Sequence, residues 1–403
     1  MSLTQSPKHE SVRTSLLALF SRLSSSGIAF SLLPILASLT LLNIQPGNRT
    51  YGPSHWFLTY EHGFLRRALI GQLLSKISFL SWHSIVIFEA IIFAVALMFT
   101  YLVFRRILFG SIAERRFAAF LLVTPAFLPH MSYMAGELDN LLYIALLLGG
   151  FALMRFQNIF GLAIATVWTL VGMVVHEAFA LMFYPLILVL ALDLVRRRRF
   201  KIGWVFAHLV VVLAAFVAVI RFGKLSGTPA QWIAAAQQRT DMRIDSIVFR
   251  VLDSSLLAQL QFVRHLYTPK LMATVLLTVA LAIPYGVILW RLLRESFALR
   301  GYSQTQIRWM LLIFAAPLSL SLLGHDVMRW ISALCINTSL YLLFLYRSAQ
   351  RDEASSSTNL RSALTSWTGS PVYVAILVYL LAIGPWGFSG NLLIANLAHI
   401  FGR

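Results

Sequence analysis

Eight acidic and histidine residues that could do chemistry lie in four short polar segments, each beside a long apolar run. They are Glu61, His62, Glu137, Asp139, His176, Glu177, His325 and Asp326. A charged side chain is costly next to lipid, so an ionisable residue beside a membrane span is by default a hypothesis of function. When the chain is threaded through a bilayer by its charge pattern, all four segments fall at one membrane face. The sequence therefore predicts that they form one shared site.

The first segment, EHGFLRR, places a base and a histidine beside two cations. Glu61 could take a proton from a hydroxyl group, with His62 next to it. The guanidinium of Arg66 or Arg67 matches a phosphate group through two parallel hydrogen bonds. The alternative is an interfacial helix whose arginines bind lipid headgroups.

The second segment, GELDN, holds two carboxylates two residues apart. Gly136 permits a turn in which Glu137 and Asp139 converge. Two nearby carboxylates raise the pKa of one of them, which suits proton abstraction, or they bind a divalent cation. The alternative is that Asp139 only caps the following helix.

The remaining segments, VVHEAF and GHDVMRW, combine histidine, acid and arginine. His176 and Glu177 join two predicted spans with almost no loop between them. In a helix, His325 and Arg329 would share a face, and Asp326 could pair with Arg329. A cation here would suit an anionic lipid phosphate, whereas the alternative for both segments is an ion pair that only holds helices together.

The elements that must position these residues are membrane helices. The chain has 403 residues, of which 59% are hydrophobic and 12% charged. A bilayer core needs about 20 apolar residues per helix and favours helices because the backbone must bond internally. We therefore predict an all-α polytopic membrane protein with about eleven transmembrane helices. The predicted spans are 27–44, 83–104, 117–135, 141–154, 159–175, 178–195, 203–220, 271–290, 310–324, 330–346 and 371–388.

Charge fixes the predicted orientation. The chain has 33 lysines and arginines against 15 acids, a net charge of +18. The basic residues stand in short blocks between apolar runs, such as Arg196 to Arg199, which is the positive-inside pattern. Asp193 is expected to pair with that block. No polar domain with a continuous basic face is visible, so we predict no nucleic-acid partner. The N-terminus is placed in the cytoplasm and the acidic segments on the outer face of the membrane.

Four regions follow from this threading. Residues 1–26 form a cytoplasmic segment, 27–346 the transmembrane core, 347–370 a cytoplasmic linker, and 371–403 a final helix with an outer tail. The core carries two long outer loops, 45–82 and 221–270, with interfacial helices. In the first loop, apolar residues recur every three or four positions, which predicts an amphipathic helix on the membrane surface. These residues are Phe64, Leu65, Ala68, Leu69, Leu73, Ile77 and Leu80.

The predicted spans contain five prolines of interest and the single cysteine. Pro125, Pro129, Pro185, Pro284 and Pro317 could break helices. The single cysteine, Cys335, lies in an apolar run and is predicted to be a small core residue.

This arrangement resembles the GT-C superfamily, multispanning glycosyltransferases that use polyprenyl-phosphate-linked sugars. The resemblance is carried by Glu61 with its surface helix, by the ExD-like Glu137-Leu138-Asp139, and by the outer loop 221–270. The strings EHGFLRR and GHDVMRW also resemble those in membrane proteins of bacterial surface-polysaccharide clusters. Glu61 stands farther from the first span than the superfamily's acid often does, which leaves the base open between Glu61 and the Glu137/Asp139 pair.

The resemblance implies a polyprenyl-phosphate-linked sugar donor, a glycan or lipid-linked acceptor, and an outer carboxylate that deprotonates the acceptor hydroxyl. The candidate catalytic residues are Glu61, Glu137 and Asp139. The candidate substrate- and phosphate-binding residues are His62, Arg66, Arg67, His176, Glu177, His325, Asp326 and Arg329. No nucleotide-binding motif is visible, and a divalent cation remains an open expectation.

Three alternatives stay open. A polysaccharide polymerase or ligase would use an undecaprenyl-diphosphate-linked glycan and would also need outer arginines and histidines. A lipid-linked glycan flippase or transporter would need broken helices and a polar path through the bilayer midplane. A purely structural membrane subunit would not explain the outer acids.

Overall fold

The computed structural model describes residues 50–61, 63–134, 137–254, 256–322, 324, 326–350, 355–383 and 386. The regular elements within these residues are helices, which confirms the predicted all-α class. The predicted segment 1–26 and the first predicted span, 27–44, lie outside the described residues.

Five of the described helices are long and apolar enough to cross a membrane. They are α5 (Trp82–Leu108), α8 (Asp139–Phe156), α12 (Ile202–Phe222), α16 (Pro269–Leu299) and α18 (Val327–Ala349). The pair α17 (Gln304–Phe314) and η2 (Ala316–Leu322), bent by 42°, adds a sixth if it counts as one span. In α5, α12 and α16 only 17% to 28% of the apolar window is buried inside the protein, as expected for helices that face lipid.

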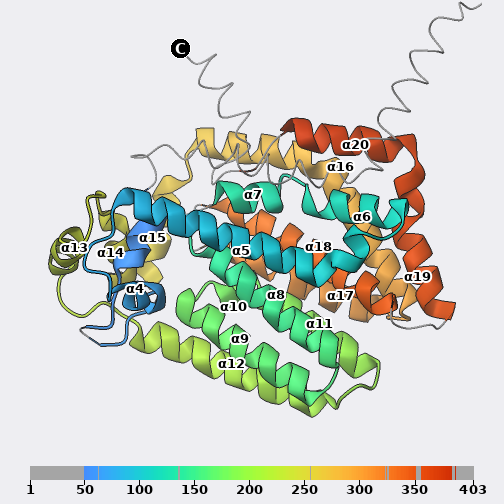
Figure 1. The fold of residues 1–403 in the computed structure, drawn as a ribbon, viewed down its shortest axis with the longest axis horizontal. Coiled ribbons are helices and arrows are strands. Elements are labelled where there is room, and N and C mark those ends of the chain that lie inside the picture. Colours follow the sequence, from blue (N-terminus) through green and yellow to red (C-terminus); the bar gives the residue numbers. More distant parts are fainter. Residues whose placement is uncertain are drawn as a thin grey trace, which may run out of the picture.

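The helices pack side by side in a bundle with α18 near its centre (Figure 1). Of the apolar window of α18, 78% is buried. The helices α9 (Ile159–Val175) and α12 lie on one side, and α16 and α20 (Pro371–Ile383) on the other (Figure 1). We call the end where α5, α8, α16 and α18 begin the loop end, because both long loops lie there. The opposite end is the arginine end.

Short helices complete the chain. At the loop end they are α3 (Tyr51–Ser54), η1 (His55–Phe57), α4 (Leu69–Leu74), α13 (Pro229–Gln237), α14 (Ser246–Asp253) and α15 (Leu256–Leu266). The others are α6 (Ile112–Leu122), α7 (Leu128–Tyr133), α10 (Phe179–Met182), α11 (Tyr184–Arg196), α19 (Ser355–Thr365) and η3 (Ser366–Gly369).

Three predicted spans are not single helices, and prolines mark the breaks. The range 117–135 divides into α6 and α7, separated by a segment that contains Pro125. The range 178–195 divides at Phe183 into α10 and α11, with Pro185 in the first turn of α11. The range 310–324 bends between α17 and η2, which contains Pro317. Proline has no N–H for the helix ladder and clashes with the preceding turn, so a helix stops before it. Pro284, by contrast, lies inside α16 without ending it.

The arginine end carries the basic residues that the charge pattern predicts. Asp193 pairs with Arg197 at 3.1 Å and with Arg300 at 2.5 Å, which confirms that Asp193 pairs with the basic block. Glu114 accepts from Tyr346 at 2.9 Å and from Arg361 at 3.1 Å. These contacts tie α6, α11, α16, α18 and α19 together at one end.

The two long loops pack on each other around a second hydrophobic cluster. It includes Trp56, Phe57, Leu58, Leu65, Ala68 and Leu80 from the first loop, and Trp232, Ile244, Val248, Phe249 and Leu252 from the second. Backbone bonds join the loops, including Leu80 N–H to the Arg239 carbonyl at 2.8 Å. The loops therefore form one cap at the loop end.

The amphipathic surface helix predicted in the first loop forms only in part: over the range 64–80, whose spacing predicts it, the one helix is α4. Arg67 has a φ of 65°, the left-handed region, which a continuing α-helix does not tolerate. Leu65 and Ala68 are buried in the cap instead of facing a membrane surface. Gly71 of α4 packs so closely on the first loop that an added Cβ would lie 1.9 Å from the Leu58 carbonyl oxygen. Tertiary packing thus overrides the helical periodicity of this segment.

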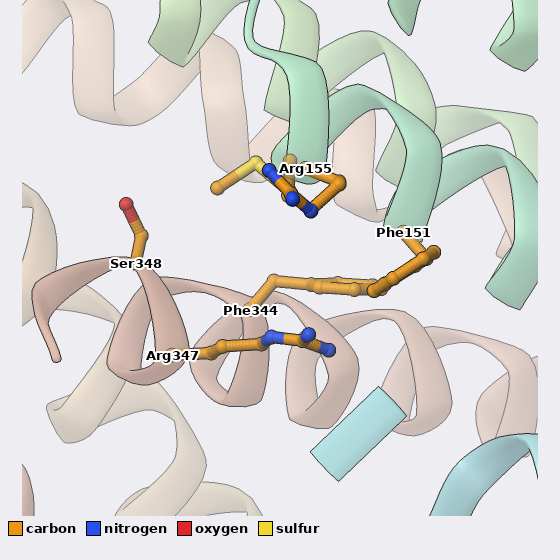
Figure 2. A pocket seen from close by; sticks show the side chains of 6 residues that line it. Phe151, Arg155, Phe344, Arg347 and Ser348 are labelled. Atoms are coloured by element: carbon orange, nitrogen blue, oxygen red, sulfur yellow. The ribbon is translucent and has the colours of Figure 1, made fainter. Parts of the chain in front are cut away.

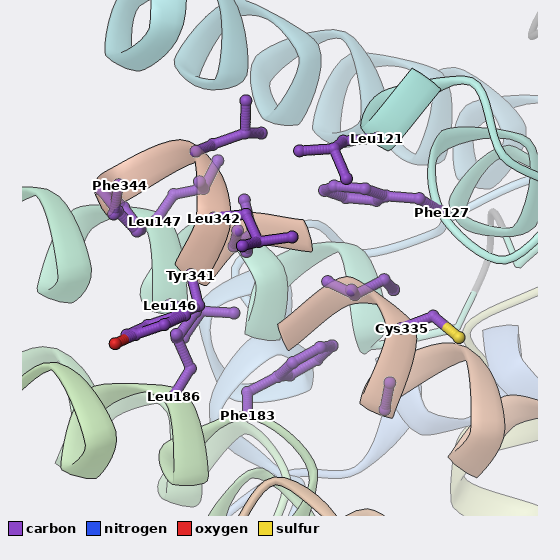
Figure 3. Close-up of a cluster of buried hydrophobic side chains, with 14 of the residues drawn as sticks. Leu121, Phe127, Leu146, Leu147, Phe183, Leu186, Cys335, Tyr341, Leu342 and Phe344 are labelled. Atoms are coloured by element: carbon purple, nitrogen blue, oxygen red, sulfur yellow. The ribbon is translucent and has the colours of Figure 1, made fainter. Parts of the chain in front are cut away.

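The main core holds the bundle together behind the cap. Figure 3 shows part of it: Tyr341 of α18 lies beside Leu146 of α8 and Leu186 of α11, and Leu121 of α6 lies beside Phe127. Cys335 is buried in the same cluster, as expected for a small core residue. Because α8 and α18 are anchored in this core, the residues at their first turns are held in fixed positions at the loop end.

Candidate functional site

The first feature of the candidate site is an ion pair between Arg67 and Glu177. Nε of Arg67 donates to both carboxylate oxygens of Glu177 at 3.0 Å, and Nη2 donates to Oε1. Nη1 of Arg66 lies 3.8 Å from the same Oε1. The side chains of Arg67 and Glu177 are only 9% and 10% exposed. The structure thus joins the segments EHGFLRR and VVHEAF, which are distant in sequence.

Each partner holds the other in its charged form. Burial alone would lower the pKa of the Arg67 guanidinium, but Glu177 outweighs it and raises that pKa. Burial alone would raise the pKa of Glu177, yet Arg67 holds it well below its usual value. The strained φ of Arg67 costs about 1–3 kcal/mol, which the ion pair can offset.

Two neutral histidines flank this pair. Arg67 Nη1 donates to His55 Nε2 at 3.2 Å, and His55 Nδ1 donates to the Gly52 carbonyl at 3.1 Å. The Ala178 N–H donates to His176 Nδ1 at 3.0 Å. Burial and the nearby Arg67 lower the pKa of His176 to about 4 and that of His55 well below its usual value. Both imidazoles are therefore uncharged near neutral pH, so the 3.4 Å contact of His176 with Glu177 is not a charged pair.

The second feature is an ion pair between Arg329 and Asp139. Nε of Arg329 donates to Oδ2 at 2.7 Å, and Nη2 donates to Oδ1. Nη1 lies 3.6 Å from Asp326 Oδ2, and the guanidinium lies 5.0 Å from the centre of the Trp330 ring. The side chains of Arg329 and Asp139 are 5% and 1% exposed.

The pair joins the first turns of two helices. Asp139 is the first residue of α8, and Arg329 lies in the first turn of α18. The alternative that Asp139 only caps α8 is wrong, because the cap position is Leu138 and the Asp139 carboxylate pairs with Arg329. The structure therefore joins GELDN to GHDVMRW.

The third feature of the candidate site is the carboxylate of Glu137. Its side chain is partly buried and makes no hydrogen bond or ion pair with any described residue. Burial raises the pKa of Glu137 to about 7; Arg329 opposes that rise, and Asp139 and Asp326 add to it. A carboxylate with that pKa both accepts and releases a proton near neutral pH, which is the behaviour of a general base.

Tyr51 connects the two ion pairs electrostatically. Its phenol interacts with Arg67 on one side, and with Glu137, Asp326 and Arg329 on the other. His176 interacts with Arg329 as well as with Arg67. All four polar segments thus contribute to one cluster, as the sequence predicts. We call it the loop-end cluster: Tyr51, His55, Arg67, Glu137, Asp139, His176, Glu177, Asp326 and Arg329.

Glu61, His62 and His325 were also predicted as site residues. Glu61 is exposed, and the charged residue it interacts with is Arg239, on the second loop. The structure thus places Glu61 outside the loop-end cluster, because the turn after Tyr60 leaves its side chain in solvent. His62 and His325 lie outside the described residues.

Sequence reasoning assigned no role to Tyr51, His55 or Glu89. Tyr51 and His55 are four residues apart and their rings meet edge to face at 5.1 Å; that spacing in YGPSHWF was the only available signal. Glu89, in the second turn of α5, is 3% exposed, and its Oε1 has no hydrogen-bond partner among the described residues. A lone acid in an apolar run was its signal.

The cluster combines two arginines held by acids, two neutral histidines and the carboxylate of Glu137, and this combination suits proton transfer. Among the described residues, no three histidine, cysteine or acidic side chains are grouped so that they could hold a metal ion. Comparison of the chain with protein-family models, with curated proteins and with solved structures finds no match. The function is therefore inferred from the residues of the site.

Proposed function

We propose that the protein is a membrane-embedded glycosyltransferase that moves a sugar from a polyprenyl-phosphate donor to a glycan or lipid-linked acceptor. The observation that carries this proposal is the loop-end cluster: two buried arginine–carboxylate pairs that both interact with Glu137, whose carboxylate makes no hydrogen bond or ion pair with a described residue. An enzyme of this class needs cations for a phosphate leaving group and a base for the acceptor hydroxyl.

Glu137 is the proposed base. Its carboxylate takes the proton of the acceptor hydroxyl while the acceptor oxygen forms a bond to the anomeric carbon of the sugar. The bond from that carbon to the phosphate oxygen breaks, and the polyprenyl phosphate leaves with the electron pair. We favour Glu137 over Glu61, which is exposed, and over Asp139, which is committed to Arg329.

Arginines are the proposed phosphate ligands. Arg66 and Arg67 stand on one side of the cluster and Arg329 on the other. Glu177 and Asp139 hold these guanidinium groups in place, so little reorganisation is needed as charge develops on the leaving phosphate. Nε of Arg66 is buried without a hydrogen-bond partner among the described residues, which leaves it a donor for a phosphate oxygen.

We place the site on the outer face of a bacterial inner membrane, in a chain with about eleven spans. The arginine end would face the cytoplasm, in line with the positive-inside pattern. Exposed tryptophans suggest that this end lies near a membrane interface: Trp204, Trp290 and Trp309 are 51%, 52% and 61% exposed. Tryptophan favours the interface between lipid and water.

The test uses the full chain in vesicles, supplied with a panel of polyprenyl-phosphate sugars and with diphosphate-linked oligosaccharides. Release of polyprenyl phosphate and labelled product are measured for the natural protein, Glu137→Gln and Glu61→Gln. We expect monophosphate donors to react, Glu137→Gln to lose about 100-fold or more in rate, and Glu61→Gln to stay near the natural rate. No turnover with any monophosphate donor, or full activity of folded Glu137→Gln, would overturn the proposal. Reaction with the diphosphate donors alone would favour the polymerase or ligase.

The broken helices support a flippase as a second candidate. The breaks at Val123–Phe127, at Phe183 and between α17 and η2 leave non-helical backbone within apolar segments. Transporters use such breaks to build substrate sites. Movement of a labelled lipid-linked glycan across the vesicle without release of polyprenyl phosphate would favour it.

A further inference from the structure

Glu89 is a buried acid that the proposed transfer reaction does not use. It lies in the second turn of α5, where 3% of its surface is exposed, and its Oε1 has no hydrogen-bond partner among the described residues. A charged carboxylate in such surroundings is costly, so a buried acid is normally paired with a cation or carries a proton. The neighbours of Glu89 decide which of the two applies.

The buried face of α5 directs the Glu89 side chain into the bundle. Thr100, about three turns further along the same face, is hydrogen-bonded to Tyr143 of α8, with 2.7 Å between the two hydroxyl oxygens. Ile87 and Ile91, on either side of Glu89 in the sequence, are 59% and 52% exposed and face away from the bundle. The Glu89 carboxyl therefore points into the protein and not toward lipid. The other residues of this buried face are Ile85, Phe93 and Ala96.

The same turn of α5 lies beside the loop-end cluster. The ring of Phe88 is 6.3 Å from the ring of Trp56 in η1, and α5 also packs against α6, α8 and α18. The titratable groups that these elements place at the loop end are His55 of η1, Asp139 of α8, Arg329 of α18 and Glu137, just before α8. Of these groups, Glu137 is the one with which Glu89 interacts electrostatically.

The arginine end gives a buried acid a different environment. Glu114 is 6% exposed and accepts a hydrogen bond from Arg361 at 3.1 Å. At the same end, Arg155 and Arg347 line a small pocket (Figure 2). Acids there have cations nearby, whereas the charged group that acts on Glu89 among the described residues is another acid. Glu89 therefore avoids a buried charge by holding a proton.

We propose that Glu89 is a positioning residue for proton transfer, which forms a carboxyl pair with Glu137 and holds the one proton that the pair shares. Two interacting buried carboxylates repel each other, so the pair favours a single negative charge. With the proton on Glu89, that charge lies on Glu137, which is the form that a base needs. The role in sugar transfer rests on the proposed function, whereas the pair itself does not.

The transfer step takes the pair from one proton to two. The O–H bond of the acceptor breaks, and its proton forms a bond to a carboxylate oxygen of Glu137. The electron pair of that O–H bond stays on the acceptor oxygen and forms the new bond to the anomeric carbon. The carboxyl pair is then uncharged, and it returns to one negative charge when Glu137 releases its proton to water. Glu89 keeps its own proton throughout.

The experiment follows the C=O bands of protonated carboxyls by infrared spectroscopy on the full chain in vesicles, without substrate, from about pH 5 to about pH 10. At about pH 7.5 we expect one band that Glu89→Gln removes and Glu89→Asp moves without removing. In Glu137→Gln this band should disappear at a pH lower by about 0.5 unit or more, because the charge that holds the proton on Glu89 is gone. The control is Glu114→Gln, in which the band and its titration should not change.

Two spectra would overturn the proposal. If natural protein and folded Glu89→Gln give the same bands at about pH 7.5, Glu89 does not hold a proton there. If the Glu89 band disappears at the same pH in natural protein and in Glu137→Gln, the two acids are not a pair. The transfer rate distinguishes this result from failure of the proposed function: a coupled titration in a protein that turns over no donor leaves the pair standing and excludes the glycosyltransferase.

Discussion

Replacing Glu177 with glutamine should destabilise the protein far more than the same replacement at Glu295. Both carboxylates accept a hydrogen bond from an arginine Nε, at 3.0 Å from Arg67 for Glu177 and at 2.7 Å from Arg291 for Glu295. The pairs differ in their contact with water. Glu177 and Arg67 are 10% and 9% exposed, whereas Glu295 and Arg291 are 38% and 77% exposed. Burial is therefore a main difference between the two pairs, together with the additional hydrogen bonds that Glu177 accepts from Arg67.

The expected loss at Glu177 follows from two independent estimates. Two unit charges about 4 Å apart interact by about 4 kcal/mol at an effective dielectric constant of about 20. Breaking a buried ion pair by removing one partner costs about 3–5 kcal/mol, because the remaining charge is left buried. For the exposed pair on α16, an i,i+4 helix pair contributes only about 0.3–0.5 kcal/mol.

The assay is a double-mutant cycle on the free energy of unfolding in mixed micelles, titrated with a denaturing detergent. Glu177→Gln and Arg67→Met should each lose about 3–5 kcal/mol. The double variant should lose much less than the sum of the two single losses, because it leaves no unpaired charge buried. A Glu177→Gln loss within about 1 kcal/mol of that for Glu295→Gln would refute the claim that burial makes this pair decisive.

Four further outcomes follow. Because burial and nearby acids raise the pKa of Glu137 to about 7, the transfer rate should rise about tenfold from pH 6 to pH 8 with its ionisation, and a flat profile would exclude Glu137 as the base. The folded protein also holds this proton more tightly than the unfolded chain, so stability should fall as the pH rises from 4.5 to 7, a slope that Glu137→Gln should lose. Arg329→Ala should weaken binding of a polyprenyl-phosphate donor at least tenfold while Arg347→Ala, at the other end, leaves its Kd nearly unchanged; equal effects in a titration would contradict the phosphate assignment. Gly71→Ala should destabilise by more than about 2 kcal/mol, because the new Cβ meets the Leu58 backbone, whereas Gly203→Ala, where nothing lies within 4 Å, should not destabilise on thermal unfolding.

Local sequence signals were reliable where a single helix decides the outcome. The apolar runs around α5, α12 and α16 are long enough to predict helices because a helix in lipid satisfies its own backbone. The helix breaks near Pro125, Pro185 and Pro317 could be predicted from these prolines, because proline lacks the N–H that bonds within one helical turn. The same signal was insufficient at Pro284, where α16 continues.

The surface helix of the first loop shows where local periodicity fails. Leu65 and Ala68 have the spacing of an amphipathic helix, yet both are buried in the hydrophobic cluster that the two loops form together. Arg67, between them, adopts a left-handed backbone and pairs with Glu177, more than one hundred residues away. A contact between residues so far apart in the sequence cannot be predicted from the spacing of neighbouring residues.

The sequence by itself determined that four polar segments would gather at one end of a helical bundle, because charge and hydropathy dictate which helix ends lie together. It left open which acids are counter-ions of arginines and which carboxylate is unpaired and could act as a base. Only the tertiary structure decided that Asp139 and Glu177 are committed to arginines, that Glu61 is exposed, and that Glu137 has no such partner among the described residues. Those distinctions depend on burial and on distances of a few ångströms between side chains from separate helices, which no single segment encodes.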